Sequence, residues 1–286
     1  MNYRHIYHAG NFADVVKHII LARSIEYLKR KPGAFRVIDT HAGIGAYDLS
    51  SEEAQKTGEW KDGIGRLLDA DLPEEAAALI APYLDAVHAT NPAGVLTRYP
   101  GSPAIARHLL RGQDRLTAIE LHPADAETLK TRFAGDFQTR VIELDGWLAL
   151  GAHLPPKEKR GLVMVDPPFE REGEFDRLVE GLMKAHRRWP GGTYLLWYPV
   201  KNRKAVATFR DALGGAGIAK ILDVSLDIRA PGVTERLDGT GLIAVNPSYP
   251  LEAEMKTVLP VLAQLLGDGK QATWRTEWLA GERAPS

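Results

Sequence analysis

The sequence of 286 residues contains no cysteine. Disulfide bonds, cysteine-ligated zinc, iron–sulfur clusters and a thiolate nucleophile are therefore excluded. The sequence also lacks an apolar run close to the roughly 18–20 residues that a membrane-spanning helix needs. Its first residues do not form the apolar core of a signal peptide. We therefore expect a cytoplasmic protein.

An excess of charge of one sign is also absent. Lys plus Arg number 36 and Asp plus Glu number 37, which gives a formal net charge of -1. A chain that coats nucleic acid by bulk positive charge is thus disfavoured, although a local basic face is possible. Hydrophobic residues make up 44% and charged residues 26%, values typical of a folded globular protein.

Patterns of short buried strands alternate with helical patterns along most of the chain. We expect strands at 35–39, 116–121, 140–144, 162–165, 193–197, 218–226 and 241–245, and helices at 11–30, 123–133, 146–154, 174–188, 203–213 and 252–266. This alternation predicts a Rossmann-like α/β fold, with a mainly parallel sheet and helices on both faces. The last two strands have no clear helix between them, which predicts an antiparallel hairpin at one edge. Residues 48–98 show helical patterns only, so we expect a helical insertion within a single domain over 1–286.

The strongest chemical motif is Asp166-Pro167-Pro168-Phe169, directly after the predicted strand 162–165. Two consecutive prolines make the backbone stiff and leave carbonyl groups without N–H donors. Asp166 and the Pro167 carbonyl can each accept one hydrogen of an amine, while Phe169 can stack on a planar ring. The motif therefore suits a ring that carries an NH2 group, although Asp-Pro and Pro-Pro also occur in ordinary turns.

Acidic residues also end the neighbouring strands. The first strand leads into a glycine-containing loop, residues 39–45, in which His41 stands at the place of the first glycine of a nucleotide-binding loop. Glu120 is placed to hold ribose hydroxyls, and Asp145 to accept from an adenine amine. Glu120 comes much later than the usual spacing of about 20 residues, and the insertion accounts for the excess. The alternative for both acids is N-capping of the helices that follow.

These features together are typical of an S-adenosylmethionine-dependent amino-methyltransferase. The loop lacks the full dinucleotide spacing, which disfavours NAD, and no Gly-Lys-Ser/Thr indicates an NTP site.

The N-terminal segment is dense in polar aromatic residues. Tyr3 and His5 can stack on bases, and Lys17 can meet phosphate, which favours a segment that faces nucleic acid. Solvated helix-face positions are the alternative for Lys17 and His18. A metal site on His5 and His8 is disfavoured, because no cysteine or paired acidic motif accompanies them.

Seven stretches over nearly the whole chain carry a family resemblance. They are Tyr3-Arg4-His5 with His8-Ala9-Gly10-Asn11, Asp39-Thr40-His41-Ala42-Gly43, Tyr99-Pro100-Gly101-Ser102-Pro103, Glu120-Leu121-His122-Pro123, Asp145-Gly146, Asp166-Pro167-Pro168 and Leu196-Trp197-Tyr198-Pro199-Val200. The chain in these stretches resembles the bacterial 23S ribosomal RNA adenine-N6 methyltransferase family of the large ribosomal subunit. It departs from the family's pattern at Phe12, where a histidine is expected, and at Phe169, where a tyrosine is common.

The resemblance implies transfer of a methyl group from S-adenosylmethionine to N6 of one adenine in 23S rRNA. It implies cofactor contacts at His18, His41, Ser102, Glu120, Asp145, Gly146 and Asp166. Asp166 is also implied as the catalytic residue, and Tyr3 as a substrate contact. The residue patterns themselves add Pro167 and Phe169 to the expected catalytic set, and His5 and Lys17 to the expected substrate contacts. We expect a monomer without a metal.

Two other functions stay open at this point. Because Asp-Pro-Pro-Phe also occurs in guanine-N2 rRNA methyltransferases, the target could be guanine N2, or adenine in DNA. A non-catalytic RNA-binding protein is the second alternative, against which the intact Asp166-Pro167-Pro168 speaks. The missing cysteine excludes pyrimidine-C5 methylation through a cysteine adduct.

Overall fold

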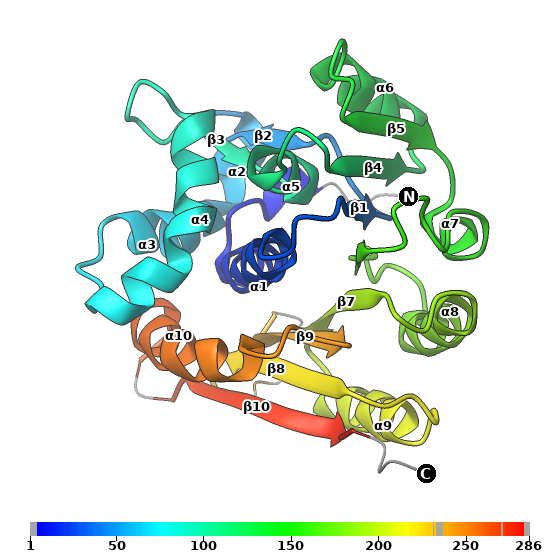
Figure 1. Ribbon diagram of the computed structural model, residues 1–286. Helices are drawn as coiled ribbons and strands as arrows, with labels where there is room; N and C mark the ends of the chain where they lie inside the picture. Colours follow the sequence, from blue (N-terminus) through cyan, green and yellow to red (C-terminus); the bar gives the residue numbers. More distant parts are fainter. Residues whose placement is uncertain (1–4, 231, 233–236, 270, 283–286) are drawn as a thin grey trace.

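The computed structural model describes residues 5–230, 232, 237–269 and 271–282. At its centre lies an eight-stranded sheet with the strand order β10-β8-β9-β7-β6-β1-β4-β5 (Figure 1). The strands are β1 (Arg36–Asp39), β4 (Arg115–Glu120), β5 (Thr139–Glu143), β6 (Gly161–Val165), β7 (Thr193–Val200), β8 (Ile221–Asp227), β9 (Gly239–Val245) and β10 (Thr273–Ala280). The five strands from β7 to β5 pair in parallel, and β9, β8 and β10 join through antiparallel pairings. The prediction of a mainly parallel α/β sheet is confirmed.

Helices cover both faces of this sheet (Figure 1). They are α1 (Phe12–Lys29), α5 (Ser102–Leu109), α6 (Pro123–Arg132), α7 (Gly146–Ala152), α8 (Glu174–Arg188), α9 (Arg203–Gly214) and α10 (Leu251–Leu266). Alternate strand residues point to opposite faces, so Val37 packs in the core with α1 and α10, and Ile38 in the core with α7, α8 and α9. None of the described helices is long and apolar enough to cross a lipid bilayer.

The start of α1 shows how the local sequence sets an element. The Asn11 side chain accepts hydrogen bonds from the backbone N–H groups of Ala13 and Asp14, which satisfies two of the free donors at the helix start. Twelve residues of α1 are buried, and they include the polar Lys17 and His18. The helix is therefore a central element with polar groups inside the molecule.

Between β1 and β4 the chain leaves the central sheet. Two short strands, β2 (Ala46–Asp48) and β3 (Arg98–Pro100), pair only with each other. Between them lie α2 (Glu52–Thr57), η2 (Lys61–Gly65), α3 (Arg66–Leu68) and α4 (Glu74–Thr90). We propose that residues 48–98 form an insertion subdomain, because the strands at its two ends do not join the central sheet.

Several elements differ from the sequence-based expectations. The antiparallel hairpin of β8 and β9 is present, but β10 pairs with β8 and occupies the edge of the sheet. Strand β10 and helix α5 were both missed, as were β2 and β3. Half of β10 is exposed to solvent and its burial does not alternate along the strand, while α5 has only eight residues, so its pattern is too short to be recognised.

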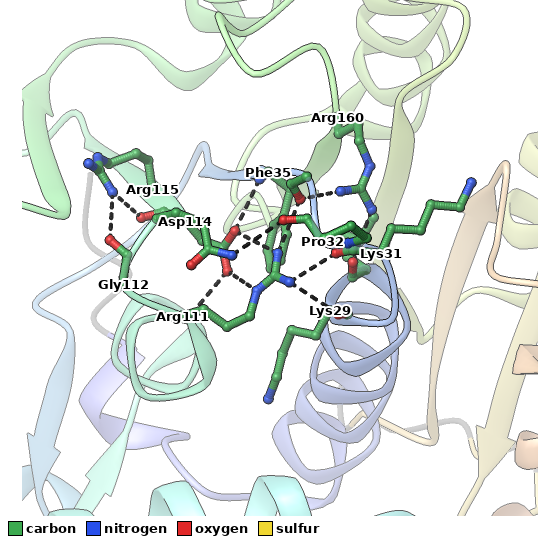
Figure 2. A network of polar contacts seen from close by, with 12 residues as sticks. Lys29, Lys31, Pro32, Phe35, Arg111, Gly112, Asp114, Arg115 and Arg160 are labelled. Carbon is green, nitrogen blue, oxygen red and sulfur yellow. Dashed lines mark hydrogen bonds and ion pairs between the residues drawn. The ribbon is translucent and has the colours of Figure 1, made fainter.

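A polar network fastens the end of α1 to the amino ends of the strands (Figure 2). Arg111 donates to the backbone carbonyls of Lys29 and Lys31 and to both carboxylate oxygens of Asp114. Asp114 is fully buried and also accepts from the backbone N–H of Phe35, directly before β1. This network satisfies carbonyls that the helix leaves free at its end. It also fixes where α1 lies against the sheet, and hence where Lys17 lies.

Candidate active site

A pocket of about 170 Å³ lies at the carboxyl ends of β1, β4 and β6. Strand β4 lies on one side of β1 and β6 on the other, so the direction of the strand order reverses here. Ligands of doubly wound α/β sheets bind at such a point, beyond the carboxyl ends of the strands.

The structure brings most of the predicted site residues together in this pocket. Its lining includes His5, Lys17, His18, His41, Ser102, Glu120, Asp145, Gly146, Asp166 and Pro167. Phe169 does not line the pocket, and Tyr3 lies outside the described residues. Five segments of the chain therefore meet at one place: the N-terminal segment, the glycine-containing loop, the end of β4, the end of β5, and the motif after β6.

A buried ion-pair network connects α1 to the motif after β6. The Lys17 Nζ lies 2.5 Å from Asp166 Oδ2 and 2.7 Å from Asp14 Oδ1. The other oxygen of Asp14 lies 2.9 Å from His5 Nε2 and accepts the backbone N–H of Gly10 at 2.9 Å. The side chains of Lys17 and Asp14 are only 4% and 2% exposed. Asp14 therefore links the N-terminal segment, through Lys17, to Asp166.

The network holds Lys17 and Asp14 in their charged forms. Burial alone would lower the pKa of Lys17, but the carboxylates of Asp14 and Asp166 outweigh it and raise the pKa above its ordinary value. Burial alone would raise the pKa of Asp14, but His5 and Lys17 hold that pKa well below its usual range. The alternative of Lys17 and His18 as solvated helix-face residues is wrong, since both are buried.

His18 lies behind the pocket in a second polar group. Its Nδ1 lies 2.7 Å from the Tyr99 hydroxyl, which in turn lies 3.0 Å from the Tyr83 hydroxyl. Burial and the neighbouring Lys17 lower the pKa of His18 well below its usual range, so the ring is neutral near pH 7. Its Nε2 is buried and has no hydrogen-bond partner within the described protein. That atom is available to a ligand in the pocket.

Glu120 is held by the backbone at the end of β4. Its two oxygens accept the N–H groups of Gly43 and His122, each at 2.8 Å. Burial raises the pKa of Glu120 above its usual value. Helix α6 has no side-chain hydrogen bond at its start, so the capping alternative for Glu120 is wrong. Each carboxylate oxygen keeps a further lone pair for a hydroxyl.

Asp39 ends β1 and carries a second free acceptor. One of its oxygens accepts the N–H of His41 at 3.3 Å, while Oδ2 is buried without a partner in the described residues. Burial raises the pKa of Asp39 to about 7. An unsatisfied buried polar atom beside a pocket is costly unless a ligand or water meets it.

The loop after β5 comes very close to the loop after β1. A Cβ on Gly146 would lie 2.2 Å from the Thr40 carbonyl oxygen, so only glycine fits here. Asp145 accepts the N–H of Trp147 at 2.9 Å and does cap α7, while it also lines the pocket. The Trp147 ring meets His41 edge-on at 5.5 Å, and burial lowers the pKa of His41 to about 4. A neutral His41 and the Trp147 ring therefore form an uncharged wall.

Phe169 takes part in an aromatic cluster beside the pocket. Its backbone has a φ of 52°, a left-handed conformation that is uncommon outside glycine and concentrates at functional sites. Its ring lies 5.0 Å from that of Phe175 and 5.7 Å from that of Trp197. Lys17 Nζ lies 5.8 Å from the centre of the same Trp197 ring. The stacking of Phe169 on a target base stays a prediction; its contacts here are with Phe175 and Trp197.

Sequence reasoning missed Asp14 and Trp197. Asp14 stands three residues before Lys17, a spacing that places both on one face of a helix, but such pairs are common on exposed helix surfaces. Only its burial distinguishes Asp14 from such surface pairs.

His5 and His8 contact the carboxylates of Asp14 and Glu59, and no group of three metal-ligating side chains occurs among the described residues.

The chain is similar over nearly its whole length to known proteins. The family model described as "Ribosomal RNA large subunit methyltransferase D, RlmJ" matches residues 32–280. The proteins called ribosomal RNA large subunit methyltransferase J of Haemophilus influenzae and Escherichia coli are 42% and 41% identical to it. Each alignment covers 99% of this chain and 100% of the relative. A crystal structure of a Legionella pneumophila protein is 34% identical and superposes with a TM-score of 0.86, covering 95% of this chain and 98% of that one.

Proposed function

The chain belongs to this family of large-subunit ribosomal RNA methyltransferases, which use S-adenosylmethionine. From that premise we propose that it methylates the N6 amine of an adenine in 23S rRNA, and that the side chain of Asp166 binds this amine. One observation carries the proposal. The Asp166-Pro167-Pro168 motif lines the same pocket as Glu120 and the glycine-containing loop, and Lys17 binds one oxygen of its carboxylate. The site therefore offers an oriented amine acceptor next to a nucleoside-shaped set of polar groups.

The pocket residues fit S-adenosylmethionine, which supplies an electrophilic methyl group on a sulfonium when bound. Glu120 has lone pairs for the two ribose hydroxyls, and Asp145 has one for an adenine amine. The free oxygen of Asp39 and the free Nε2 of His18 are buried polar atoms that lack partners within the described protein. Ser102, Gly146 and the neutral His41 complete the proposed cofactor contacts.

The chemistry that the protein itself supplies is orientation of the amine. An adenine amine is a poor nucleophile, because its lone pair is delocalised into the ring. Lys17 fixes the Asp166 carboxylate through Oδ2 and leaves Oδ1 to accept one amine hydrogen. The Pro167 carbonyl accepts the other. These two hydrogen bonds favour a tetrahedral nitrogen with its lone pair directed at the methyl group.

S-adenosylmethionine, when bound, would supply the methyl group: a nitrogen–carbon bond would replace the carbon–sulfur bond, the sulfur would keep that electron pair, and the nitrogen would release one proton to water. Holding the two reacting groups in line can contribute roughly 7–11 kcal/mol to lowering the barrier. No covalent intermediate with the enzyme is needed.

Asp14 acts in this scheme as a positioning residue. It neutralises Lys17 and, through His5 and the Gly10 N–H, holds the N-terminal segment against the pocket. We propose that His5 and Tyr3 contact the RNA substrate from this side, whereas Lys17, whose ammonium is buried between two carboxylates, acts on the substrate through Asp166. We propose that the protein acts as a monomer and, because its substrate is an rRNA, in the cytoplasm.

The decisive experiment identifies the product. The protein is incubated with labelled S-adenosylmethionine and rRNA that lacks the modification, the RNA is digested, and the labelled nucleoside is separated. We expect N6-methyladenosine from the native protein and a rate about 10²–10⁴-fold lower from Asp166→Asn. Asp211→Asn, an exposed carboxylate on α9, is the matched control and should retain the native rate.

The labelled nucleoside also tests the alternatives. If the labelled nucleoside is N2-methylguanosine, the target base is guanine and the adenine assignment is wrong. The absence of any labelled product, together with intact RNA binding, would favour the non-catalytic RNA-binding protein.

A further inference from the structure

A second pocket, of about 300 Å³, lies on the face of the sheet that carries α7, α8 and α9. It shares no residue with the catalytic pocket and sits toward the amino ends of β1 and β4. Its lining consists of Arg36, Ile38, Arg115, Thr117, Phe137, Gln138, Thr139, Arg140 and His153. We name this site the basic pocket.

The strand register explains why the sheet is open here. Arg36 pairs with Arg115 across β1 and β4, and Thr117 pairs with Arg140 across β4 and β5. Residues two apart on a strand share a face, so all four side chains point to the same side of the sheet. The helix on this side, α7, has only seven residues. A doubly wound sheet usually has apolar side chains at such positions, and helices pack on them. Here the four side chains are polar, so this part of the sheet has no apolar surface for a helix to cover.

The charges in the basic pocket are largely unbalanced. Glu158 binds Arg36 through two hydrogen bonds of 2.9 Å each. The Arg115 guanidinium donates only to the backbone carbonyls of Gly112 and Asp114 in the described structure. Arg140 is exposed and makes no hydrogen bond or ion pair with any described residue. The single carboxylate of Glu158 therefore faces both Arg36 and Arg115, and Arg140 has no carboxylate among the described residues. The three guanidinium groups keep an excess of positive charge, so an anion among them would gain charge-assisted hydrogen bonds.

Two further features match a nucleic-acid phosphate. Phe137 is 77% exposed, and the Arg115 guanidinium lies 5.6 Å from the centre of its ring, an aromatic–arginine pair of the kind that stacks on bases. The buried Thr117 forms the floor, and its hydroxyl can still donate after accepting from Arg36. The polar groups of the basic pocket, the Thr117 hydroxyl and the arginine guanidinium groups, are thus hydrogen-bond donors.

We infer that the basic pocket binds a phosphate group, and that in the working enzyme this group belongs to the backbone of the RNA substrate. The pocket lies one strand length, roughly 15–20 Å, from the catalytic pocket. Strand β5 is the end of the sheet, so an RNA can pass from one pocket to the other around this edge. The inference goes beyond methyl transfer, because it concerns a contact that RNA makes away from the reacting base.

The test compares Arg140→Gln with a matched control, Arg187→Gln, which removes an exposed arginine from α8. Neither change touches the catalytic pocket or the pair of Arg36 and Glu158. Binding of an rRNA fragment is measured between about 50 and 200 mM salt. Loss of one phosphate contact should weaken binding about 10-fold and reduce the salt slope by about 0.7–0.9. Arg187→Gln should leave both unchanged.

A second measurement uses His153 as a reporter for inorganic phosphate. Burial and the nearby Arg140 and Arg36 lower the pKa of His153, and an anion bound among these arginines should raise it. The His153 ring signals are followed by NMR as phosphate is added, in the native protein and in Arg140→Gln. A saturable rise in the pKa that Arg140→Gln abolishes supports the pocket.

The combined results separate the sources of the phosphate. A reduced salt slope supports the RNA backbone as the ligand. A phosphate response at His153 with unchanged RNA binding supports a free anion as the ligand and overturns the RNA assignment. No response to either ligand overturns the inference as a whole. Because binding is measured without methyl transfer, the outcome does not depend on which base is methylated.

Discussion

The Lys17→Met variant tests the buried network most directly. Methionine keeps the length and most of the volume of the lysine side chain but removes its charge. It leaves the carboxylates of Asp14 and Asp166 facing each other without the ammonium group that both contact. Both oxygens contact the same nitrogen in the native protein, at 2.7 and 2.5 Å, so they are close neighbours in a site that is nearly closed to water.

The expected loss of stability is large for a single substitution. Removing one partner of a buried ion pair costs about 3–5 kcal/mol, because the remaining charge is neither hydrated nor neutralised. One of the two carboxyl groups should then take up a proton, since like charges at this distance raise a pKa. A protonated or displaced Asp166 no longer orients the amine, and misplacing a reacting group costs about 10²-fold in rate.

The assay pairs urea unfolding with methyl transfer at pH 7.5. The pKa of Lys17 is higher in the folded protein than in the unfolded chain, where it is about 10.4. The stability that Lys17 contributes is therefore fully present below about pH 10.4 and is lost only as the pH rises through the pKa of the folded protein. The pKa of Asp14 is lowered, so its effect is present above about 3.9 and is lost on acidification. Lys17 and Asp14 therefore both contribute at pH 7.5.

The double variant Asp14→Asn/Lys17→Met supplies the control. The introduced asparagine keeps an acceptor for the Gly10 N–H and removes one of the two opposed charges. We expect the double variant to be more stable than Lys17→Met alone, by about 1–3 kcal/mol, the usual range for coupled neighbours. A double variant less stable than Lys17→Met, or a cost for Lys17→Met below about 1 kcal/mol, would refute the reasoning.

Three further predictions concern other parts of the molecule. Glu120→Ala removes charge-assisted hydrogen bonds worth about 1.5–3 kcal/mol, so calorimetry should show S-adenosylmethionine affinity about one to two decades lower; unchanged affinity would contradict its ribose role. Arg111→Ala leaves the fully buried Asp114 unpaired and should lower the free energy of unfolding by about 3 kcal/mol with cofactor affinity retained in the folded fraction; a urea midpoint equal to the native one would disprove it. Burial raises the pKa of Asp39 to about 7, so the stability it confers is lost as pH rises from about 4 through 7. Asp39→Asn should therefore flatten the dependence of Tm on pH over that interval, and an unaltered dependence would count against a titrating Asp39.

Much of the fold follows from local sequence. Helix α8 has the predicted bounds, 174–188, because its apolar residues recur at helical spacing and basic residues fill its last turn. The buried strand β6 is a short apolar run closed by Asp166-Pro167, and proline lacks the N–H that a ladder hydrogen bond needs. Such features depend on neighbours in the chain, so the chain alone encodes them.

Elements at the margin were harder to predict. Strand β10 has the sequence Thr-Trp-Arg-Thr-Glu-Trp-Leu-Ala, and it forms because β8 offers an unpaired edge. An edge strand of this kind depends on its partner more than on its own residues. For the same reason the sequence placed the hairpin of β8 and β9 at the edge of the sheet, where β10 lies instead.

The candidate site divides along the same line. The sequence by itself determined which acids end the parallel strands, because strand ends and turns are local. It thereby predicted the chemistry that we propose, with amine acceptors beside a nucleotide-like loop. Only the tertiary structure decided that Lys17, 149 residues before Asp166, binds that carboxylate, and that Asp14 neutralises the pair. It likewise decided that Phe169 contacts Trp197, and that three arginines from neighbouring strands share one uncovered face. The physical reason is that burial and strand register are set by how α1 and the strands pack together, and these decide whether a charge is solvated or paired.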